Sequence, residues 1–348
     1  VWIYKIFVCL CFVFVLMNNS YSQDEREKLN KMTIPELLKA GDNFFLKKDF
    51  NSALEYYIQA WSIDSNNKAA NIAVVEVLFS IKDYNMALSW LERSEHKFKN
   101  IPQLQLLHCA ILQEKGLFDE SLKRLLSLQN NKNFKNDYKF WFYLGIAYFR
   151  TKNAEEARIV LEKSIRMNSN FAEAHYLLGK VMIDLNLTTQ GLLSYYYYLL
   201  LDPTSHQAAE VFLTIKQYLH SFNTGNFDWL IDSNYTTLEM KFEYKVQVEL
   251  VQQINSFDVK AENSIDVFNQ ETDNLFTIIY RVFKDKKTEL ESDNFIIKYI
   301  PYFYKIKTSN TLTTFLYYIG QSTDKSYLKW LETHPKEYEN FTKVIERG

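Results

Sequence analysis

Glycine and proline are scarce in this chain, with 8 glycines and 5 prolines among 348 residues. Both residues are common in tight turns, so their scarcity disfavours turn-rich β architectures and favours long helices. The net charge is only −2, which leaves no basic footprint for nucleic acid. Hydrophobic residues make up 47% of the chain, so a sizeable core can be buried and wholesale disorder is not expected.

Motifs for cofactors, metals and nucleophilic catalysis are also missing. The sequence contains no glycine-rich phosphate loop and no Gly-x-Ser-x-Gly. None of its six histidines pairs with another at i, i+4, which excludes the zinc-peptidase motif. His108 and His175 fall inside predicted helices, and metal sites need three or four converging ligands, so both are read as packed side chains. We expect no catalytic residues, no cofactor and no metal.

The N-terminus has the pattern of a secretory signal. Lys5 precedes an apolar stretch at 6–17, and the small residues Ser20 and Ser22 follow it. This pattern predicts a signal peptide at 1–22, cleaved after Ser22, and an exported mature chain that is periplasmic or secreted. The apolar stretch is shorter than the ~20 residues of an ordinary membrane span. The alternative is an uncleaved N-terminal segment, which would be the only membrane contact that we expect.

A 34-residue period runs through the middle of the chain. Counted from Tyr138, positions 4, 7, 8, 11, 20, 24 and 27 hold Trp141, Leu144, Gly145, Tyr148, Ala157, Leu161 and Ser164. Positions 4, 7, 8 and 11 share one helix face because they follow the 3.6-residue period. Small residues at positions 8 and 20 let two helices approach closely, and large residues at 11 and 24 fill the space between hairpins. The pattern resembles the tetratricopeptide repeat (TPR).

The same register predicts five repeat units, with two residues inserted before the fourth. The units are 34–67, 68–101, 102–135, 138–171 and 172–205. One hairpin cannot bury its own apolar face, so the hairpins must stack. The resemblance implies an all-α fold, a right-handed superhelical solenoid of five TPR hairpins. An amphipathic stretch at 206–222 is expected to cover the last hairpin as a capping helix.

Residues 227–348 follow a glycine-containing break at 221–226 and are expected to form a helical C-terminal domain. Apolar and polar residues alternate from Leu238 to Leu250, as in a strand. A capping-box pattern at Thr236 and Glu239, and the lack of a partner strand, favour a helix instead. Helices are predicted at 236–256, 270–286, 291–306, 310–320, 324–333 and 335–346.

Cys109 and the run of four tyrosines at 195–198 are read as core residues. Cys109 occupies position 8, where the helices approach, and a reactive thiol would need exposure and an activating neighbour. Tyr195 and Tyr198 occupy positions 24 and 27 and should face the repeat core, whereas Tyr196 and Tyr197 should point toward the next helix. A stacking platform for bases would normally come with a basic groove, which the sequence lacks.

The resemblance to TPR proteins also implies a function. In such solenoids the first helices line a concave surface that binds a protein or peptide partner, and positions 2, 5, 9, 12 and 13 face it. Aromatic residues there would anchor a partner, and cations would hold an acidic segment. The alternative is that the aromatics only pack between neighbouring hairpins. The predicted site residues are Lys139, Phe142, Ile146, Phe149, Arg150, Tyr176 and Lys180.

One specialised binding mode of the family is not expected here. Some TPR modules hold a chaperone's C-terminal carboxylate with Lys and Asn at positions 5 and 9 of their first unit. In this chain those positions hold Leu38 and Asp42. The Asp42 carboxylate would repel a second carboxylate, so the first unit should not bind such a ligand.

The sequence thus predicts a non-catalytic binding scaffold of the cell envelope or the extracellular space. One alternative is a structural or assembly component that self-associates through 227–348 and would do so in purified form. The other is an enzyme with an unrecognised site in 227–348, which would bring His, Asp or Glu side chains together in one pocket.

Overall fold

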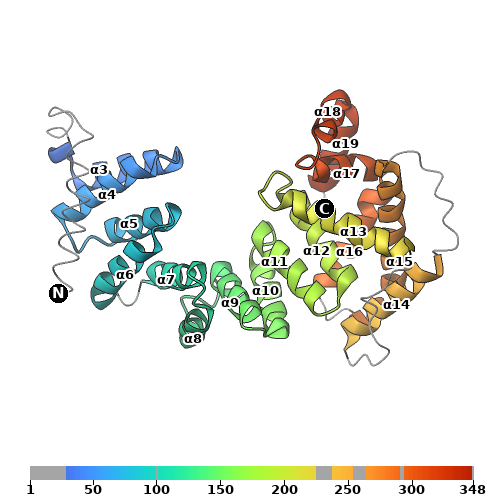
Figure 1. Cartoon of the computed structure of the whole chain (residues 1–348), viewed down its shortest axis with the longest axis horizontal. Coiled ribbons are helices and arrows are strands. Elements are labelled where there is room, and N and C mark those ends of the chain that lie inside the picture. Colours follow the sequence, from blue (N-terminus) through green and yellow to red (C-terminus); the bar gives the residue numbers. More distant parts are fainter. Residues whose placement is uncertain (1–28, 99–100, 225–236, 254–263, 291–293, 347–348) are drawn as a thin grey trace. The chain divides into compact units, whose positions relative to one another are not determined.

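The computed structural model describes residues 29–98, 101–224, 237–253, 264–290 and 294–346 (Figure 1). Within these ranges the regular secondary structure is helical throughout, which confirms the all-α fold class. The predicted signal peptide and its cleavage site lie outside the described residues. No helix in the described ranges combines the length and the apolar character needed to cross a bilayer.

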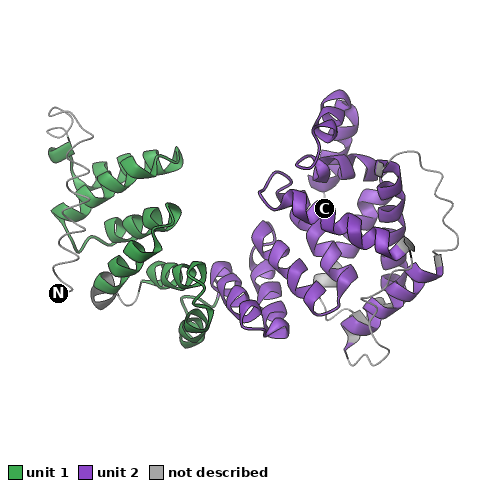
Figure 2. Ribbon diagram, viewed as in Figure 1, with its two compact units in different colours: residues 1–135 green, residues 136–348 purple. Residues whose placement is uncertain are grey.

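The chain divides into two compact units, residues 1–135 and 136–348 (Figure 2). In unit 1, consecutive helices pack in pairs, and each pair falls within one of the first three predicted repeat units. The helices of unit 1 are α3 (Ile34–Leu46), α4 (Phe50–Ile63), α5 (Lys68–Ser80), α6 (Tyr84–Phe98), α7 (Pro102–Glu114) and α8 (Phe118–Leu128).

Unit 2 begins with the two helix pairs of the fourth and fifth predicted repeat units. These helices are α9 (Tyr138–Arg150), α10 (Ala154–Met167), α11 (Ala172–Asp184) and α12 (Thr188–Leu201). The rest of unit 2 is also helical. Its helices are α13 (Ala208–Thr224), α14 (Leu238–Gln253), α15 (Ser264–Leu290), α16 (Asn294–Thr308), α17 (Leu312–Gly320), α18 (Lys325–Thr333) and α19 (Pro335–Glu346).

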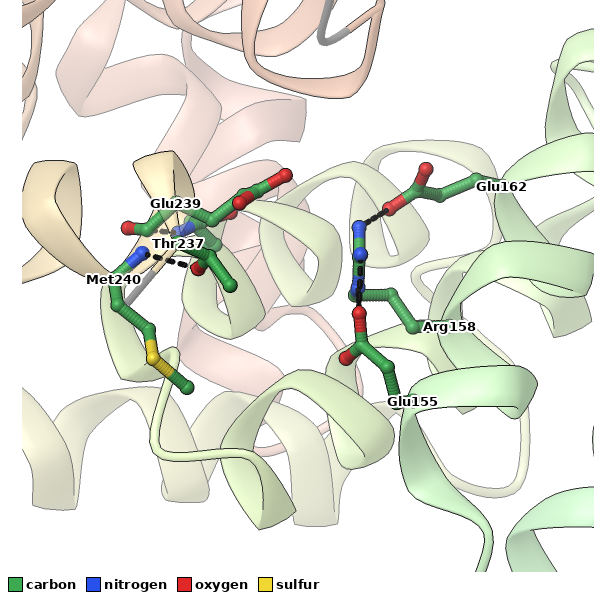
Figure 3. Close-up of polar contacts among 7 residues, drawn as sticks. Glu155, Arg158, Glu162, Thr237, Glu239 and Met240 are labelled. Atoms are coloured by element: carbon green, nitrogen blue, oxygen red, sulfur yellow. Dashed lines mark hydrogen bonds and ion pairs between the residues drawn. The ribbon is translucent and has the colours of Figure 1, made fainter. Parts of the chain in front are cut away.

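The segment with strand-like alternation is the helix α14. Phe242, Val246 and Leu250 are all buried, and their four-residue spacing places them on one helix face. A residue pattern of period two also contains every i, i+4 pair, so the alternation does not distinguish strand from helix. The hydroxyl of Thr237 accepts the N–H of Met240 at 3.2 Å and caps this helix (Figure 3).

The turn between the two helices of each predicted repeat unit has the same conformation in all five. The fifteenth residue of every unit has a positive φ, between 59° and 75°. The next residue donates its N–H to the carbonyl at position 11, as Asp49 does to Phe44 at 3.0 Å. This is a Schellman-type helix end, and it matches the register predicted from the sequence. The five residues are Lys48, Lys82, Gly116, Lys152 and Asn186.

Position 8 is the point of closest approach between the paired helices. A Cβ on Gly179 would lie 2.4 Å from a ring carbon of Tyr195, so this glycine cannot be replaced without a shift. In the third unit the position holds Cys109, which is fully buried. The Ser121 hydroxyl, at position 20, donates to the carbonyl of Cys109 at 3.1 Å. Burial raises the pKa of the Cys109 thiol to about 12, so it stays protonated at neutral pH.

Helix α12 lies inside the core of unit 2, with every residue from Thr188 to Leu200 buried. The Tyr196 hydroxyl lies 2.9 Å from that of Thr272 in α15. The ring of Tyr197 meets the ring of Tyr299 in α16 edge-on, with centroids 4.8 Å apart. The tyrosine run is therefore part of the core, as predicted. Its two middle residues contact α15 and α16, whereas the sequence pointed to the next helix.

Helices from both sides of the predicted domain boundary share this core. Phe212 of α13 packs edge-on against Phe268 of α15 and against Tyr327 of α18, with centroids 5.1 and 5.7 Å apart. The expected capping helix is thus itself covered by the helices that follow it. Residues 225–236, where the boundary is predicted, lie outside the described ranges.

Candidate functional site

Five of the predicted site residues form a stripe along α9. They are Lys139, Phe142, Ile146, Phe149 and Arg150. Steps of three and four residues place them on one side of the helix. The two cations are exposed, and the three apolar side chains between them are half-buried. Helix α9 begins after Asp137, whose carboxylate accepts the N–H of Lys139 at 2.9 Å, and the helix itself contains no acidic residue.

Tyr176 and Lys180 continue the site on α11, where they contact each other. The Lys180 ammonium donates to the Tyr176 hydroxyl at 2.9 Å and lies 4.9 Å from the centre of its ring. The Tyr176 ring also packs against Tyr198, with centroids 5.3 Å apart. Both site residues are half-buried, and these contacts hold the ring in one orientation.

Each aromatic side chain of the site is partly packed on the core and partly exposed. Phe142 meets Phe171, the residue before α11, edge-on with centroids 4.8 Å apart. Ile146 and Phe149 also pack against the core of unit 2. Packing between hairpins therefore accounts for the buried part of each side chain. The exposed part is available to a partner.

The helix behind the stripe carries a network of ion pairs (Figure 3). The Arg158 guanidinium of α10 bonds to the carboxylates of Glu155 at 2.5 Å and Glu162 at 2.8 Å. Burial alone would lower the pKa of Arg158, but hydrogen bonds to both glutamates and their charges raise it above its ordinary value. The arginine is permanently charged, and both of its ion pairs lie within α10.

His175 is a structural residue, as predicted. One ring nitrogen, Nε2, lies 2.9 Å from the carbonyl of Ser169, and the other, Nδ1, lies 2.7 Å from the Tyr299 hydroxyl. Because a carbonyl only accepts, Nε2 carries the proton, and Nδ1 of the neutral ring accepts from Tyr299. In the described part of the chain, no three His, Cys, Asp or Glu side chains converge in a way that would hold a metal ion.

A buried carboxylate, Glu243 of α14, was not singled out by sequence reasoning. It accepts the N–H of Thr189 at 2.6 Å and the N–H of Gln190 at 3.4 Å, at the start of α12. The Thr189 hydroxyl and the amide of Gln247 also donate to it. Burial raises the pKa of Glu243, and these hydrogen bonds oppose the rise. Its partner on α12 is 54 residues away, so no local pattern marks it.

Residues 138–171, which form α9 and α10, match the tetratricopeptide repeat family model. These residues therefore form a tetratricopeptide repeat. The matched repeat is the fourth predicted unit, and it carries five of the seven predicted site residues.

Among curated proteins, the human protein O-mannosyl-transferase TMTC3 is 32% identical to this chain over 133 residues, covering 36% of this chain. The chain spans only 14% of that protein's length. The match therefore gives no information about the chemistry of this chain.

Several solved structures resemble the chain at low identity. PilF of Pseudomonas aeruginosa has a TM-score of 0.48 at 14% identity, covering 67% of this chain and 99% of PilF. A thermophilic TPR protein of Thermus thermophilus has a TM-score of 0.45 at 12% identity, covering 54% and 100%. MamA of Desulfovibrio magneticus has a TM-score of 0.42 at 14% identity, covering 50% and 97%. The match over 138–171 identifies a tetratricopeptide repeat in that segment.

Proposed function

We propose that this chain is a non-catalytic scaffold that binds a protein or peptide partner along the exposed side of α9 and α11. TPR proteins generally act as protein-binding scaffolds. The observation that carries the proposal is the α9 stripe within the matched repeat, where apolar side chains lie between Lys139 and Arg150. Tyr176 and Lys180 extend this surface onto the neighbouring helix.

The fixed orientation of the aromatic rings supports a binding role. Phe142 is held by Phe171, and Tyr176 is held by Tyr198 and Lys180. A side chain that is already ordered loses little conformational entropy when a partner covers it. Partly exposed aromatics of this kind supply large contact areas and dominate binding energies in many interfaces.

The proposal that the chain is not an enzyme is supported by the state of its candidate reactive groups. The Cys109 thiol is fully buried, and its raised pKa keeps it protonated. Both ring nitrogens of His175 are engaged in hydrogen bonds. Neither residue is available as a nucleophile or a general base.

We also propose that the chain is exported to the periplasm or the extracellular space after cleavage at Ser22. The sequence pattern at 1–22 supports this. N-terminal sequencing of the protein from fractionated native cells tests the proposal. A mature N-terminus at Gln23 is expected, whereas a full-length chain in the membrane fraction would support the anchor alternative.

The binding proposal is tested by crosslinking the tagged chain in its native envelope fraction and identifying the captured partner. A Phe142→Ala, Tyr176→Ala variant should lose that partner while circular dichroism shows intact helices. The matched control is Tyr280→Ala, Tyr304→Ala, which removes a stacked, half-buried pair from α15 and α16. The control should retain the partner.

Three outcomes separate the hypotheses. Loss of one dominant partner in the first variant only supports the site on α9 and α11. Equal capture by all three proteins means that the site is wrong and directs attention to another surface. Capture of the chain itself and of nothing else favours the assembly alternative.

A further inference from the structure

The last residue of the repeat unit is connected to the aromatic ring of the proposed binding site in both the fourth and the fifth unit. Phe142 and Tyr176 each occupy position 5 of their unit, and we call them the anchor rings. Position 34 holds Phe171 in the fourth unit and Ser205 in the fifth. Phe171 packs directly against Phe142, with centroids 4.8 Å apart. Ser205 is connected to Tyr176 through one intervening side chain, that of Tyr198.

Ser205 lies in the turn between α12 and α13 and fixes the hydroxyl of Tyr198. The Ser205 hydroxyl donates to the carbonyl of Asp202 at 3.1 Å and is also bonded to the Tyr198 hydroxyl. A serine hydroxyl has one proton, and here the carbonyl accepts it, so Tyr198 must be the donor in the second bond. Tyr198 is buried, and Ser205 is its only hydrogen-bond partner among the residues that the structure describes. The position of the Tyr198 ring therefore depends on Ser205.

The Tyr198 ring in turn supports the anchor ring of Tyr176. Their centroids are 5.3 Å apart, and the ring planes are inclined by 44°. The ring of Tyr195 lies on the same helix, α12, with its centroid 6.3 Å from that of Tyr176. The Tyr176 hydroxyl accepts from Lys180 at 2.9 Å. A shift of the Tyr198 ring would thus remove one of the contacts that orient Tyr176.

The pairing of Tyr198 with Ser205 is particular to the fifth unit. Tyr198 occupies position 27, and no other predicted unit has an aromatic residue there. A tyrosine at this buried position brings a hydroxyl that needs a partner, because an unsatisfied buried polar group is costly. Ser205 supplies that partner within the unit that carries the Tyr176 anchor ring. The residues at position 27 of the other units are Ala60, Ser94, Leu128 and Ser164.

We propose that Phe171 and Ser205 are positioning residues of the site on α9 and α11, which hold the two anchor rings in the orientation that a partner meets. Phe171 acts by direct ring contact, and Ser205 acts through the Tyr198 hydroxyl. The consequence for binding rests on the proposed function, whereas the orientation of Tyr176 can be measured without a partner. A ring that is free to reorient loses more conformational entropy when a partner covers it. Loss of the Ser205 hydroxyl should therefore weaken binding roughly two- to tenfold.

Fluorine NMR of the full chain with meta-fluorotyrosine at position 176 tests the orientation. Ser205→Ala removes the hydroxyl but keeps the backbone bonds of this residue to Asp202 and from Ala208, at 3.5 and 3.1 Å. The fluorine signal should move toward that of a solvent-exposed fluorotyrosine, and Ser205→Thr should restore it. The matched control is Thr204→Ala, which removes an exposed hydroxyl from the same turn and should leave the signal unchanged. An unchanged signal in Ser205→Ala overturns the inference.

A double-mutant cycle distinguishes this hydrogen bond from a general loosening of the turn. Tyr198→Phe removes the donor of the same bond, so it should move the fluorine signal of Tyr176 as Ser205→Ala does. The combined variant should move the signal no further, because both changes remove one interaction. Circular dichroism checks that the helices survive in each variant. Additive displacements would mean that the two residues act independently, and the inference would be wrong.

The crosslinking assay of the proposed function tests the consequence for binding. Ser205→Ala and Phe171→Leu should each lower the yield of the dominant partner that the unaltered chain captures, and Ser205→Thr should retain it. If Ser205→Ala keeps the full yield while Phe142→Ala, Tyr176→Ala loses it, the proposed site stands and the positioning role is wrong. If the double alanine variant also keeps the yield, the proposed site itself is refuted. The fluorine signals then decide alone whether Ser205 orients the Tyr176 ring.

Discussion

The hydrogen bond between His175 and Tyr299 should make a measurable contribution to the stability of unit 2. It joins α11, which carries part of the proposed binding site, to α16 near the end of the chain. Both side chains are fully buried, and the two atoms are 2.7 Å apart. Tyr299→Phe removes the hydroxyl that donates to the buried Nδ1 of His175. A buried acceptor that loses its donor costs about 1–3 kcal/mol.

Urea unfolding followed by tyrosine fluorescence and circular dichroism measures this loss. Tyr302→Phe is the matched control, because that hydroxyl forms no hydrogen bond with a described residue and its ring is only half-buried. The control should change the free energy of unfolding by less than about 0.5 kcal/mol. Hydrogen exchange should show the loss of protection in α11 and α16 together. A Tyr299→Phe protein as stable as the control would refute the reasoning.

Four further substitutions have expected outcomes. Burial raises the pKa of Glu243, so the folded chain holds that proton more tightly than the unfolded chain, and stability falls as pH rises from the unfolded to the folded pKa. Glu243→Gln should flatten that part of the urea-unfolding pH profile, and an unchanged slope contradicts the assignment. Lys152→Gly should increase the free energy of unfolding by roughly 0.5 kcal/mol and so raise the thermal midpoint, because a Cβ is disfavoured at φ 66°. Gly116→Lys should lower the thermal midpoint for the same reason. Gly179→Ala should cost about 1–3 kcal/mol, since its Cβ would overlap the Tyr195 ring, and a neutral effect in chemical denaturation would show that the ring moves freely.

The repeat register could be predicted because the constraint is local and periodic. Gly179 must be small because Tyr195, sixteen positions later in the same unit, lies against it. The same spacing places Gly41 against the ring of Tyr57. Contacts of this kind recur every 34 residues, so a single sequence contains several copies of the same evidence.

Contacts that hold the later helices have no such repetition. Glu243 caps α12 from 54 residues away, and Tyr299 reaches His175 across 124 residues. Neither partner lies at a spacing that a helix or a repeat would produce. The helices themselves were predicted well in 227–348, because each carries its own apolar face, although α15 begins at Ser264 rather than near residue 270.

The positions of the candidate site residues could be predicted from the sequence, but the exposed fraction of each side chain could not. The sequence places Phe142 and Tyr176 at groove positions, and it cannot apportion their surfaces between core and solvent. In the structure each ring is partly buried and partly exposed. Phe171 packs against one side of Phe142, and Tyr198 packs against one side of Tyr176. Binding by the remaining surface stays a prediction until a partner is captured.

The burial of α12 from Thr188 to Leu200 limits how this protein can change in evolution. Repeat arrays lengthen when a hairpin is duplicated and the new copy stacks on the exposed side of its neighbour. Here the side of α12 that a sixth hairpin would need is filled by Phe276, Tyr299 and Phe303 from later helices. A hairpin inserted after α12 would expose that aromatic surface. Gain or loss of repeats should therefore occur upstream of α11, with the last hairpin and the helices after it inherited as one block.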